Sequence, residues 1–374
     1  MAAHRYRINY WHESGEILQM KKHAIIPIFI PHRGCPHDCV FCNQRKITAR
    51  TDFVTPEDAR KIIDTWLTTL RPDGAGACGD DGDRNTVEAA FYGGSFTGLE
   101  IEEQSAFLEV TYEYKQKGLI DKVHLSTRPD YIDREILDNL RKYSVDTIEL
   151  GVQSFDDEVL RLSNRGHSSE DVYRAVALIK EYGFELGIQL MIGLPGDTAE
   201  TCIMSAEETA RLKPSLARLY PTIVLDDTEL YNMYKSGEYK PLSREEAVYR
   251  TKEMYKILDD AGITIMRVGL KSTEIIGEGG AINGGTYHPA FRQLVEGEIA
   301  KERIEPLLSY ILIDDAPSSE KKNVIISSNN LWFSAMIGHK ACNRKYFAEK
   351  YPDAVIKYSA DNNLSDGEFS VSTC

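Results

Sequence analysis

The sequence lacks any long apolar run and any secretory leader. No stretch approaches the ~20 apolar residues that a membrane-spanning helix needs, and the longest apolar candidate, residues 24–30, suits a buried strand. The first 22 residues are polar and include histidine and arginine. We therefore expect a cytoplasmic protein with no membrane partner. If Met20 is the natural start, residues 1–19 form an extension outside the fold.

Positive charge is also scarce. The 44 lysines and arginines face 58 aspartates and glutamates, for a formal net charge of −14, and a uniformly acidic protein binds nucleic acid poorly. The balance changes from Lys322 onwards, where six basic and five acidic residues give a net charge of +1. An RNA partner would therefore have to be held locally.

The order of apolar runs predicts an α/β fold. Hydrophobic residues make up 42% and charged residues 27% of the 374, which excludes wholesale disorder and allows one large domain with an appendage. Seven short apolar runs alternate with helical segments, three of which (101–117, 171–182 and 244–261) stop at a glycine. The runs are 24–30, 87–92, 122–126, 147–150, 186–191, 216–221 and 263–268. This repetition favours a partial TIM-type (β/α) barrel, and a doubly wound open sheet is the alternative.

Cysteine is distributed unevenly. There are seven cysteines, an odd number, so a disulfide framework is not expected. Three of them, Cys35, Cys39 and Cys42, fall within eight residues directly after the first predicted strand. Three thiolates this close can hold three corners of an iron–sulfur cluster and leave a fourth iron open to a small molecule. The alternative is structural zinc, with His32 or His37 as the fourth ligand.

The spacing Cys-x3-Cys-x2-Cys, with an aromatic residue before the last cysteine, resembles that of the radical S-adenosylmethionine (SAM) enzymes. This resemblance implies a [4Fe-4S] cluster whose open iron chelates SAM. A reductant such as flavodoxin or ferredoxin would supply the electron that cleaves SAM. The resulting 5′-deoxyadenosyl radical abstracts hydrogen from a substrate, while the protein binds, orients and excludes water.

The same resemblance implies seven SAM-contacting residues, which lie at or after the ends of predicted strands. They are Gly93, Gly94, Ser95, Ser126, Gln153, Arg165 and Gln189. Ser95 departs from the family, which more often has glutamate there. Gln189 stands where coproporphyrinogen III oxidases have an aspartate for the ribose, and its amide can still hydrogen-bond a hydroxyl.

Longer segments resemble the radical SAM domain of the elongator complex catalytic subunit. The matching segments are 126–132, 149–154, 164–167, 191–196 and 219–241, and the resemblance covers about residues 22–300. That subunit carries a C-terminal acetyltransferase domain, whose length nothing here matches, so its acetyl-CoA chemistry is not transferred. A looser resemblance links the chain to oxygen-independent coproporphyrinogen III oxidases. The elongator resemblance favours tRNA or other RNA as substrate. A dehydrogenase or decarboxylase of small molecules is the enzymatic alternative, and a zinc-stabilised RNA-binding protein is the non-catalytic one.

Substrate contacts are expected near the mouth of the barrel. Tyr220 ends the sixth strand, and the glycine-rich segment 277–285 is followed by Tyr287 and His288. A barrel-wall role for Tyr220 and a solvent-exposed turn for the other two are equally good interpretations.

The C-terminal part predicts a small αβ unit. Strands at 323–327 and 355–359 flank short helices at 331–337 and 342–349, and a Gly-x-x-Ala loop joins the helices. This order is similar to the KH motif, whose GXXG loop clamps a nucleotide backbone. We expect RNA contacts from Gly338, Lys340, Arg344 and Lys345, with a small αβ lid as the alternative. The predicted division is an extension (1–19), a radical SAM core (20–304) and the small domain (305–374).

Overall fold

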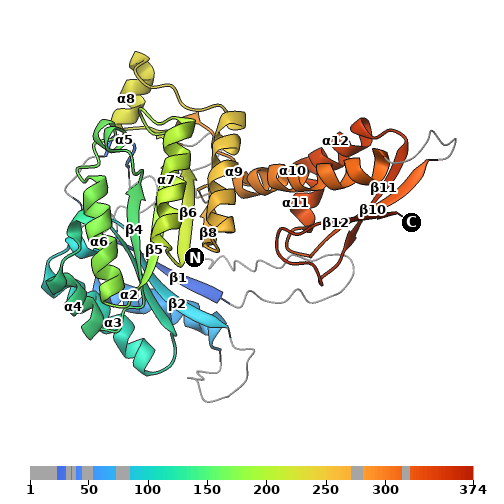
Figure 1. Ribbon diagram of the computed structural model, residues 1–374. Helices are drawn as coiled ribbons and strands as arrows, with labels where there is room; N and C mark the ends of the chain where they lie inside the picture. The colour runs from blue at the N-terminus through green and yellow to red at the C-terminus, as the bar shows by residue number, and fades with distance from the viewer. Residues whose placement is uncertain are drawn as a thin grey trace, which may run out of the picture.

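The computed structural model describes residues 23–30, 35, 39–43, 54–72, 85–270, 281–313 and 321–373. Its main feature is a seven-stranded, all-parallel sheet with the order β1-β2-β3-β4-β5-β6-β8 (Figure 1). The strands are β1 (His23–Ile30), β2 (Thr86–Gly93), β3 (Lys122–Thr127), β4 (Thr147–Gln153), β5 (Glu185–Ile192), β6 (Leu216–Pro221) and β8 (Thr264–Val268). Within the described residues β1 and β8 are unpaired edges, so the sheet is an open partial TIM-type barrel, as the sequence predicts.

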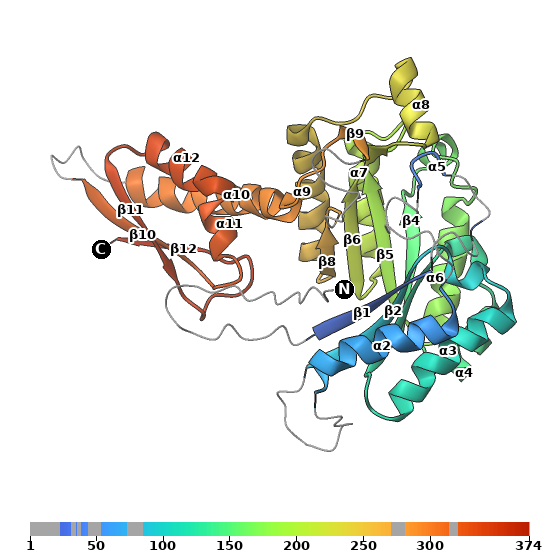
Figure 2. The ribbon, with the colours of Figure 1, turned by 180° about the vertical axis from the view of Figure 1, so that it is seen from behind.

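Helices cover one face of this sheet (Figures 1 and 2). They are α2 (Pro56–Leu70), α3 (Ile101–Gln116), α4 (Arg134–Lys142), α6 (Ser169–Glu181), α7 (Ala199–Leu212) and α9 (Arg244–Asp260). Capping boxes at Thr55, Ser168 and Thr198 satisfy the first amides of α2, α6 and α7. The sequence predicted α3, α6 and α9 with nearly these bounds and did not assign the others.

Short elements gather at the carboxyl ends of the strands. The helices α5 (Asp157–Leu162) and α8 (Glu229–Ser236) follow β4 and β7. The strand β7 (Ile223–Leu225) comes directly after β6 and pairs antiparallel with β9 (Ile282–Gly285). This two-stranded ribbon was not predicted, and it carries the segment that leads to His288. The predicted glycine-rich residues 277–280 lie outside the described residues.

A long helix, α10 (Phe291–Ile313), leads from β8 to the C-terminal unit (Figure 1). That unit contains β10 (Lys322–Ser328), α11 (Phe333–Ile337), the 3-10 turn η3 (His339–Ala341), α12 (Cys342–Lys350), β11 (Ala354–Ala360) and β12 (Ser370–Thr373). Its sheet has the order β11-β10-β12, with β11 parallel and β12 antiparallel to β10. Because α10 runs without a break through residues 304 and 305, the division into domains at that point stays a prediction.

One apolar cluster connects the two parts. It contains Phe91 and Phe107 between the sheet and α3, and it continues through Ile299 and Leu308 of α10 to Phe347 of α12. The C-terminal unit therefore packs on α10 through a shared core. Among the described helices, none is long and apolar enough to cross a bilayer.

Candidate active site

The cysteine segment lies at the carboxyl end of β1. Cys39 is buried and Cys35 and Cys42 are half-buried, with the Cys42 amide donating to the Cys39 carbonyl at 2.9 Å. The Val40 amide donates to the Ser163 carbonyl at 3.1 Å, and the Val40 carbonyl accepts from the Leu230 amide at 2.7 Å. These bonds fix residues 39–42, including Cys39 and Cys42, between α5 and α8. The predicted zinc ligands His32 and His37 lie outside the described residues.

Arg165, which follows α5, joins the cysteines to the sheet. Its Nη1 donates to the Sγ of Cys39 at 3.2 Å, and its Nη2 donates to the Gly151 carbonyl at 2.6 Å. A Cβ at position 151 would lie 3.0 Å from Nε2 of Gln153, so a larger residue there would displace the Gln153 amide. The structure therefore places the predicted residue Arg165 against a predicted cluster ligand.

Arg128, which the sequence reasoning missed, connects these groups to a neighbouring strand end. Its Nη2 donates to the Arg165 carbonyl at 2.5 Å, and its Nε and Nη2 form a bidentate pair with Asp130 at 2.9 Å each. Burial lowers the pKa of Arg128, but Asp130 and the thiolates of Cys39 and Cys35 together raise it above its usual value. The sequence feature that could have indicated Arg128 is its Arg-x-Asp spacing with Asp130 after the end of β3.

The Gly-Gly-Ser segment after β2 lies against β1. Gly93 has φ 113°, and a Cβ would lie 2.9 Å from the Ile30 carbonyl oxygen, so only glycine fits without strain. The Gly94 amide donates to the same oxygen at 2.9 Å. The buried Ser95 Oγ lies 2.8 Å from Thr127 Oγ1 and accepts from the Arg128 amide at 3.2 Å. Ser95 therefore ties the ends of β2 and β3 together.

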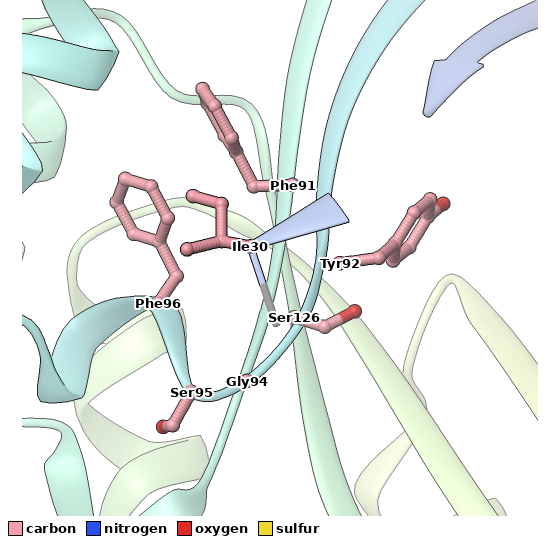
Figure 3. Close-up of a pocket in the computed structure, with 7 residues that line it drawn as sticks. All are labelled: Ile30, Phe91, Tyr92, Gly94, Ser95, Phe96 and Ser126. Atoms are coloured by element: carbon pink, nitrogen blue, oxygen red, sulfur yellow. The ribbon is translucent and has the colours of Figure 1, made fainter. Parts of the chain in front are cut away.

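A small recess, too narrow to admit a water molecule, lies beside this segment. It is lined by Ile30, Phe91, Tyr92, Gly94, Ser95, Phe96 and Ser126 (Figure 3). The ring centroids of Phe91 and Phe96 are 4.7 Å apart, and both rings lie on one side of Ile30. The hydroxyls of Tyr92 and Ser126 lie on the other side. The recess has an apolar wall and a polar wall at the point where the sequence predicts SAM contacts.

Two predicted SAM-contacting glutamines meet at the ends of β4 and β5. Nε2 of Gln189 donates to Oε1 of Gln153 at 3.2 Å. Gln153 has φ 72°, and the register of β4 against β5 shifts between Gly151 and Gln153. A positive φ is unusual for glutamine, and a bulge of this kind re-aims the side chain. Strained backbone at this point is consistent with a functional position.

Charged side chains fill the face of the sheet opposite the helices, and the sequence reasoning missed them as well. We call Glu88, His124, Glu149, Arg218 and Tyr92 the lumen network. His124 Nδ1 lies 2.5 Å from a Glu88 oxygen, Arg218 Nε lies 2.7 Å from a Glu149 oxygen, and Arg218 Nη2 donates to the Tyr92 hydroxyl at 2.6 Å. The predicted residue Ser126 joins it by donating to Glu149 Oε1 at 3.0 Å. Buried charges this dense need mutual pairing to offset their desolvation.

The lumen network has strongly perturbed acids. Burial raises the pKa of Glu88, but hydrogen bonds with His124 and His23 lower it more, to about 2. Burial raises the pKa of Tyr92 above its usual range, so its hydroxyl stays protonated. Glu88 therefore remains an anion at physiological pH, and Tyr92 remains a neutral hydroxyl that accepts from Arg218. The sequence feature that could have indicated the lumen network is the presence of polar and charged residues inside otherwise apolar strands.

The three predicted substrate residues are spread along the barrel mouth. Tyr220 is half-buried in β6, opposite Met191 of β5. Tyr287 packs against Ile223 and Leu225 of the ribbon. The His288 ring does not join the cysteine group in the described structure but meets His339 of the C-terminal unit, with centroids 4.9 Å apart.

Family models match most of this architecture. Residues 29–208 match the Radical SAM superfamily, and residues 214–301 match the Radical_SAM C-terminal domain. The chain belongs to the radical SAM superfamily. This membership identifies the chain as a radical SAM enzyme and favours an iron–sulfur cluster over structural zinc at the cysteine triplet.

Several relatives are named for tRNA or elongator functions. The chain is 33% identical to a tRNA uridine(34) acetyltransferase of Methanocaldococcus jannaschii over 60% of this chain and 47% of that protein. It is 30% identical to human elongator complex protein 3 over 43% of this chain and 33% of that protein. The solved structure of Methanocaldococcus infernus Elp3 with an N-terminal deletion is 23% identical, with a TM-score of 0.57 over 82% of this chain and 71% of that chain. That structure shares the fold. This chain spans about half the length of the acetyltransferases it matches.

The donor chemistry of the described residues fits the [4Fe-4S] cluster and SAM that radical SAM enzymes use. Three cysteines fall within eight residues of sequence, and a guanidinium contacts one of them. Among the described residues, no three Cys, His, Asp or Glu side chains are gathered closely enough to hold a metal ion, so the fit rests on the donor set and not on a preformed site. Two buried polar atoms, Nε of Arg165 and Nη1 of Arg128, have no hydrogen-bond partner in the described part of the chain. Buried groups of this kind are usually satisfied, so a bound polar ligand would complete the site.

Proposed function

We propose that this chain is a radical SAM enzyme that modifies a nucleoside in RNA, with tRNA as its substrate. The similarity to tRNA uridine(34) acetyltransferases over 60% of the chain carries this proposal. The open edge of the sheet, between β1 and β8, supports it, because a large polymeric substrate needs access to the lumen. Acetyl transfer is not included in the proposal.

Cys35, Cys39 and Cys42 would hold the cluster in this proposal. When bound, the cluster and SAM supply an electron and a 5′-deoxyadenosyl radical that abstracts a hydrogen atom from the substrate. Arg165 would hold a carboxylate of SAM, because its guanidinium is fixed at Cys39 and Gly151. Gly94 would present backbone to the methionine end.

Three further side chains would orient the rest of SAM. Gln153 and Gln189 form a paired amide donor and acceptor at adjacent strand ends. Ser126 offers a hydroxyl that is held by Glu149. Tyr220, Tyr287 and His288 would line the approach of the substrate, and a reductant such as flavodoxin or ferredoxin would provide the electron.

A second candidate function is a dehydrogenase or decarboxylase acting on a small molecule. The lumen network favours it, because paired buried charges such as Arg218 and Glu149 could orient a small charged substrate. A small substrate would have to fit entirely within the barrel. With an RNA substrate, only the modified nucleotide would enter the barrel and the rest of the polymer would stay outside.

Comparative mass spectrometry of tRNA nucleosides separates the two functions. A deletion strain should lose a modified nucleoside, wild-type chain should restore it, and the Cys39→Ala chain should not. A Cys202→Ala chain is the matched control, because Cys202 is buried in α7 and donates to Asp197 at 3.1 Å. An identical nucleoside profile in wild-type and deletion strains would refute the RNA substrate and favour the small molecule.

A further inference from the structure

The C-terminal unit follows the segments matched by the family models, which end at residue 301. Its helix–helix turn contains Gly338, Lys340 and Ala341, whose φ angles are 79°, 52° and 60°. A Cβ on Gly338 would lie 2.6 Å from Cys342 Sγ and 2.8 Å from the Asn343 nitrogen. Glycine is thus required here by packing inside the unit, and Gly338 is buried.

The turn is held against α10 by a buried asparagine. Nδ2 of Asn343 donates to the carbonyls of Gly297 at 2.7 Å and Ala335 at 3.1 Å. A Cβ on Gly297 would lie 3.7 Å from Gly338 Cα, an ordinary van der Waals contact, so α10 and the turn pack directly against each other. The turn is therefore held rigidly in place, while Lys340 is exposed.

The same contacts bring the turn to the mouth of the barrel. His339 Nδ1 lies 3.1 Å from Gln293 Oε1 in the first turns of α10, and the His339 ring packs edge-on against His288. His288 follows the β7–β9 ribbon, and a Cβ on Gly269 at the end of β8 would lie 2.9 Å from Phe291 Cβ. Two regions about 50 residues apart in sequence thus form one continuous surface.

This surface and the start of α12 beside it carry cations without carboxylate partners. Arg244 and Lys340 lie near His288, and Arg344 and Lys345 lie in the first turn of α12. All four are exposed, and across the described ranges none of them makes an ion pair or a side-chain hydrogen bond. Farther along α9 and α12 the cations are paired with carboxylates of α10. Lys252 and Lys256 lie 3.1 Å from Glu302, and Lys350 contacts Glu305.

Arg244 is in an unfavourable place for a cation. It is the first residue of α9, directly after the N-cap Ser243, where the helix dipole disfavours positive charge. Burial lowers the pKa of His288 most, followed by His339 and then by the positive charges of Arg244 and Lys340. An anionic partner would relieve this repulsion between neighbouring positive groups.

We propose that Arg244, His288, His339 and Lys340, extended by Arg344 and Lys345, form one surface that binds the phosphodiester backbone of RNA beside the barrel mouth. This inference rests on the proposed function, since it locates the RNA that would carry the substrate nucleotide. Exposed lysines and arginines bind phosphates by releasing counterions, which gives a salt-dependent affinity. The net charge of −14 makes a local cationic surface necessary for such a partner.

The test uses the full chain carrying Lys340→Glu together with Arg344→Glu. Both side chains are exposed and Gly338 is left unchanged, so the packing against α10 is kept. The matched control reverses two exposed cations on the far helices, Lys61→Glu with Arg134→Glu, for the same change in net charge. The binding of labelled tRNA is measured by fluorescence anisotropy at several salt concentrations.

We expect the Lys340/Arg344 variant to bind tRNA about tenfold more weakly at low salt. The slope of log affinity against log salt should become shallower by about 2, one unit for each lost phosphate contact. The control should bind like wild type. Equal affinity and slope in variant and wild type, or no tRNA binding by wild type at low salt, would overturn the proposal.

Nucleoside analysis then separates this inference from the proposed function. If the tRNA profile changes on deletion but the variant binds and modifies tRNA normally, the surface is wrong and the function stands. If wild type binds tRNA through these residues but no nucleoside depends on the chain, the surface stands and the proposed modification fails. Circular dichroism of each variant checks that the fold is retained.

Discussion

The barrel and the C-terminal unit treat charge in opposite ways. The barrel buries charged side chains and pairs them. Glu149 is paired with Arg218 on the inner face of the sheet, and buried Arg128 is paired with Asp130. The C-terminal unit has a buried core of apolar side chains such as Ile326, Met336 and Phe347. Its cations at the η3 turn and on α12 lie in solvent.

This difference indicates two kinds of ligand. Burying an ion costs several kcal/mol unless it is paired, so buried pairs are kept where a small ligand must be held in a dry site. Exposed lysines cost little and act over about 8–10 Å in physiological salt, which suits a large solvated polyanion. The difference supports the proposal that the barrel makes the contacts with SAM and that the C-terminal unit binds the backbone of an RNA substrate.

Removing a cysteine should give the largest effect. Anaerobically reconstituted wild-type protein should bind about four irons per chain and produce 5′-deoxyadenosine from SAM under reductant. Cys39→Ala should abolish both, because one of three cluster ligands is lost. Iron and sulfide analysis with product chromatography makes the measurement.

Two controls sharpen this result. Cys202→Ala should retain full iron, since Cys202 bonds Asp197 within the core and is not near the triplet in sequence. The Lys340→Glu and Arg344→Glu variant should also retain it, because the C-terminal unit supplies no cysteine to the cluster. Full iron content in Cys39→Ala would mean that the triplet is not the ligand set.

Removing one SAM contact should give an intermediate effect. Arg165→Met keeps the aliphatic stem but loses the guanidinium, and a lost hydrogen bond to a charged group costs ~1.5–3 kcal/mol. SAM affinity, measured anaerobically by calorimetry, should fall roughly ten- to a hundredfold with the cluster still assembled. Arg134→Met on the exposed face of α4 is the control. Equal SAM affinity in Arg165→Met and wild type would show that the site lies elsewhere in the barrel.

The seven barrel strands were predictable because each is a short apolar run beside turn residues. The largest error is at the end of β4, which was expected to stop at Leu150 but continues to Gln153. The bulge between Gly151 and Gln153 extends it, and a bulge depends on the neighbouring strand. Local sequence carries no such information.

The helix α10 shows a different limit. No helix was predicted there, and the sequence contains Gly297 and Pro306, which normally weaken or end a helix. The structure keeps both inside one helix, and the Gly297 carbonyl accepts a hydrogen bond from the Asn343 side chain of α12. Tertiary packing outweighs local helix propensity here. Because α10 is continuous through residues 304 and 305, the local sequence cannot test the domain boundary predicted at that point.

The site was predictable where a short motif carries it. The cysteine triplet and Arg165 lie in segments that resemble the superfamily, and the structure brings Arg165 to Cys39. Arg128 and the lumen network were missed, since their ion pairs join residues far apart in sequence: Glu88 with His124, and Glu149 with Arg218. Such pairs follow from strand order and register, which exist only once the sheet has formed.

Acid titration should give the smallest effect and tests the buried side of the comparison. The folded pKa of Glu88 is about 2, below its ordinary value of 4.5, so its contribution to stability is complete above about pH 4.5 and is lost as pH falls toward 2. Between pH 6 and pH 4 the wild-type unfolding free energy should lose about 1 kcal/mol through this group. Glu88→Gln should lack that component, and urea unfolding at the two pH values measures it. Glu170→Gln is the control, because Glu170 is exposed on α6 and makes no ion pair in the described part of the chain, and it should keep the wild-type pH dependence. If both variants keep the wild-type pH dependence, Glu88 is not held as an anion by the histidines, and the barrel does not differ from the surface in how it stabilises charge.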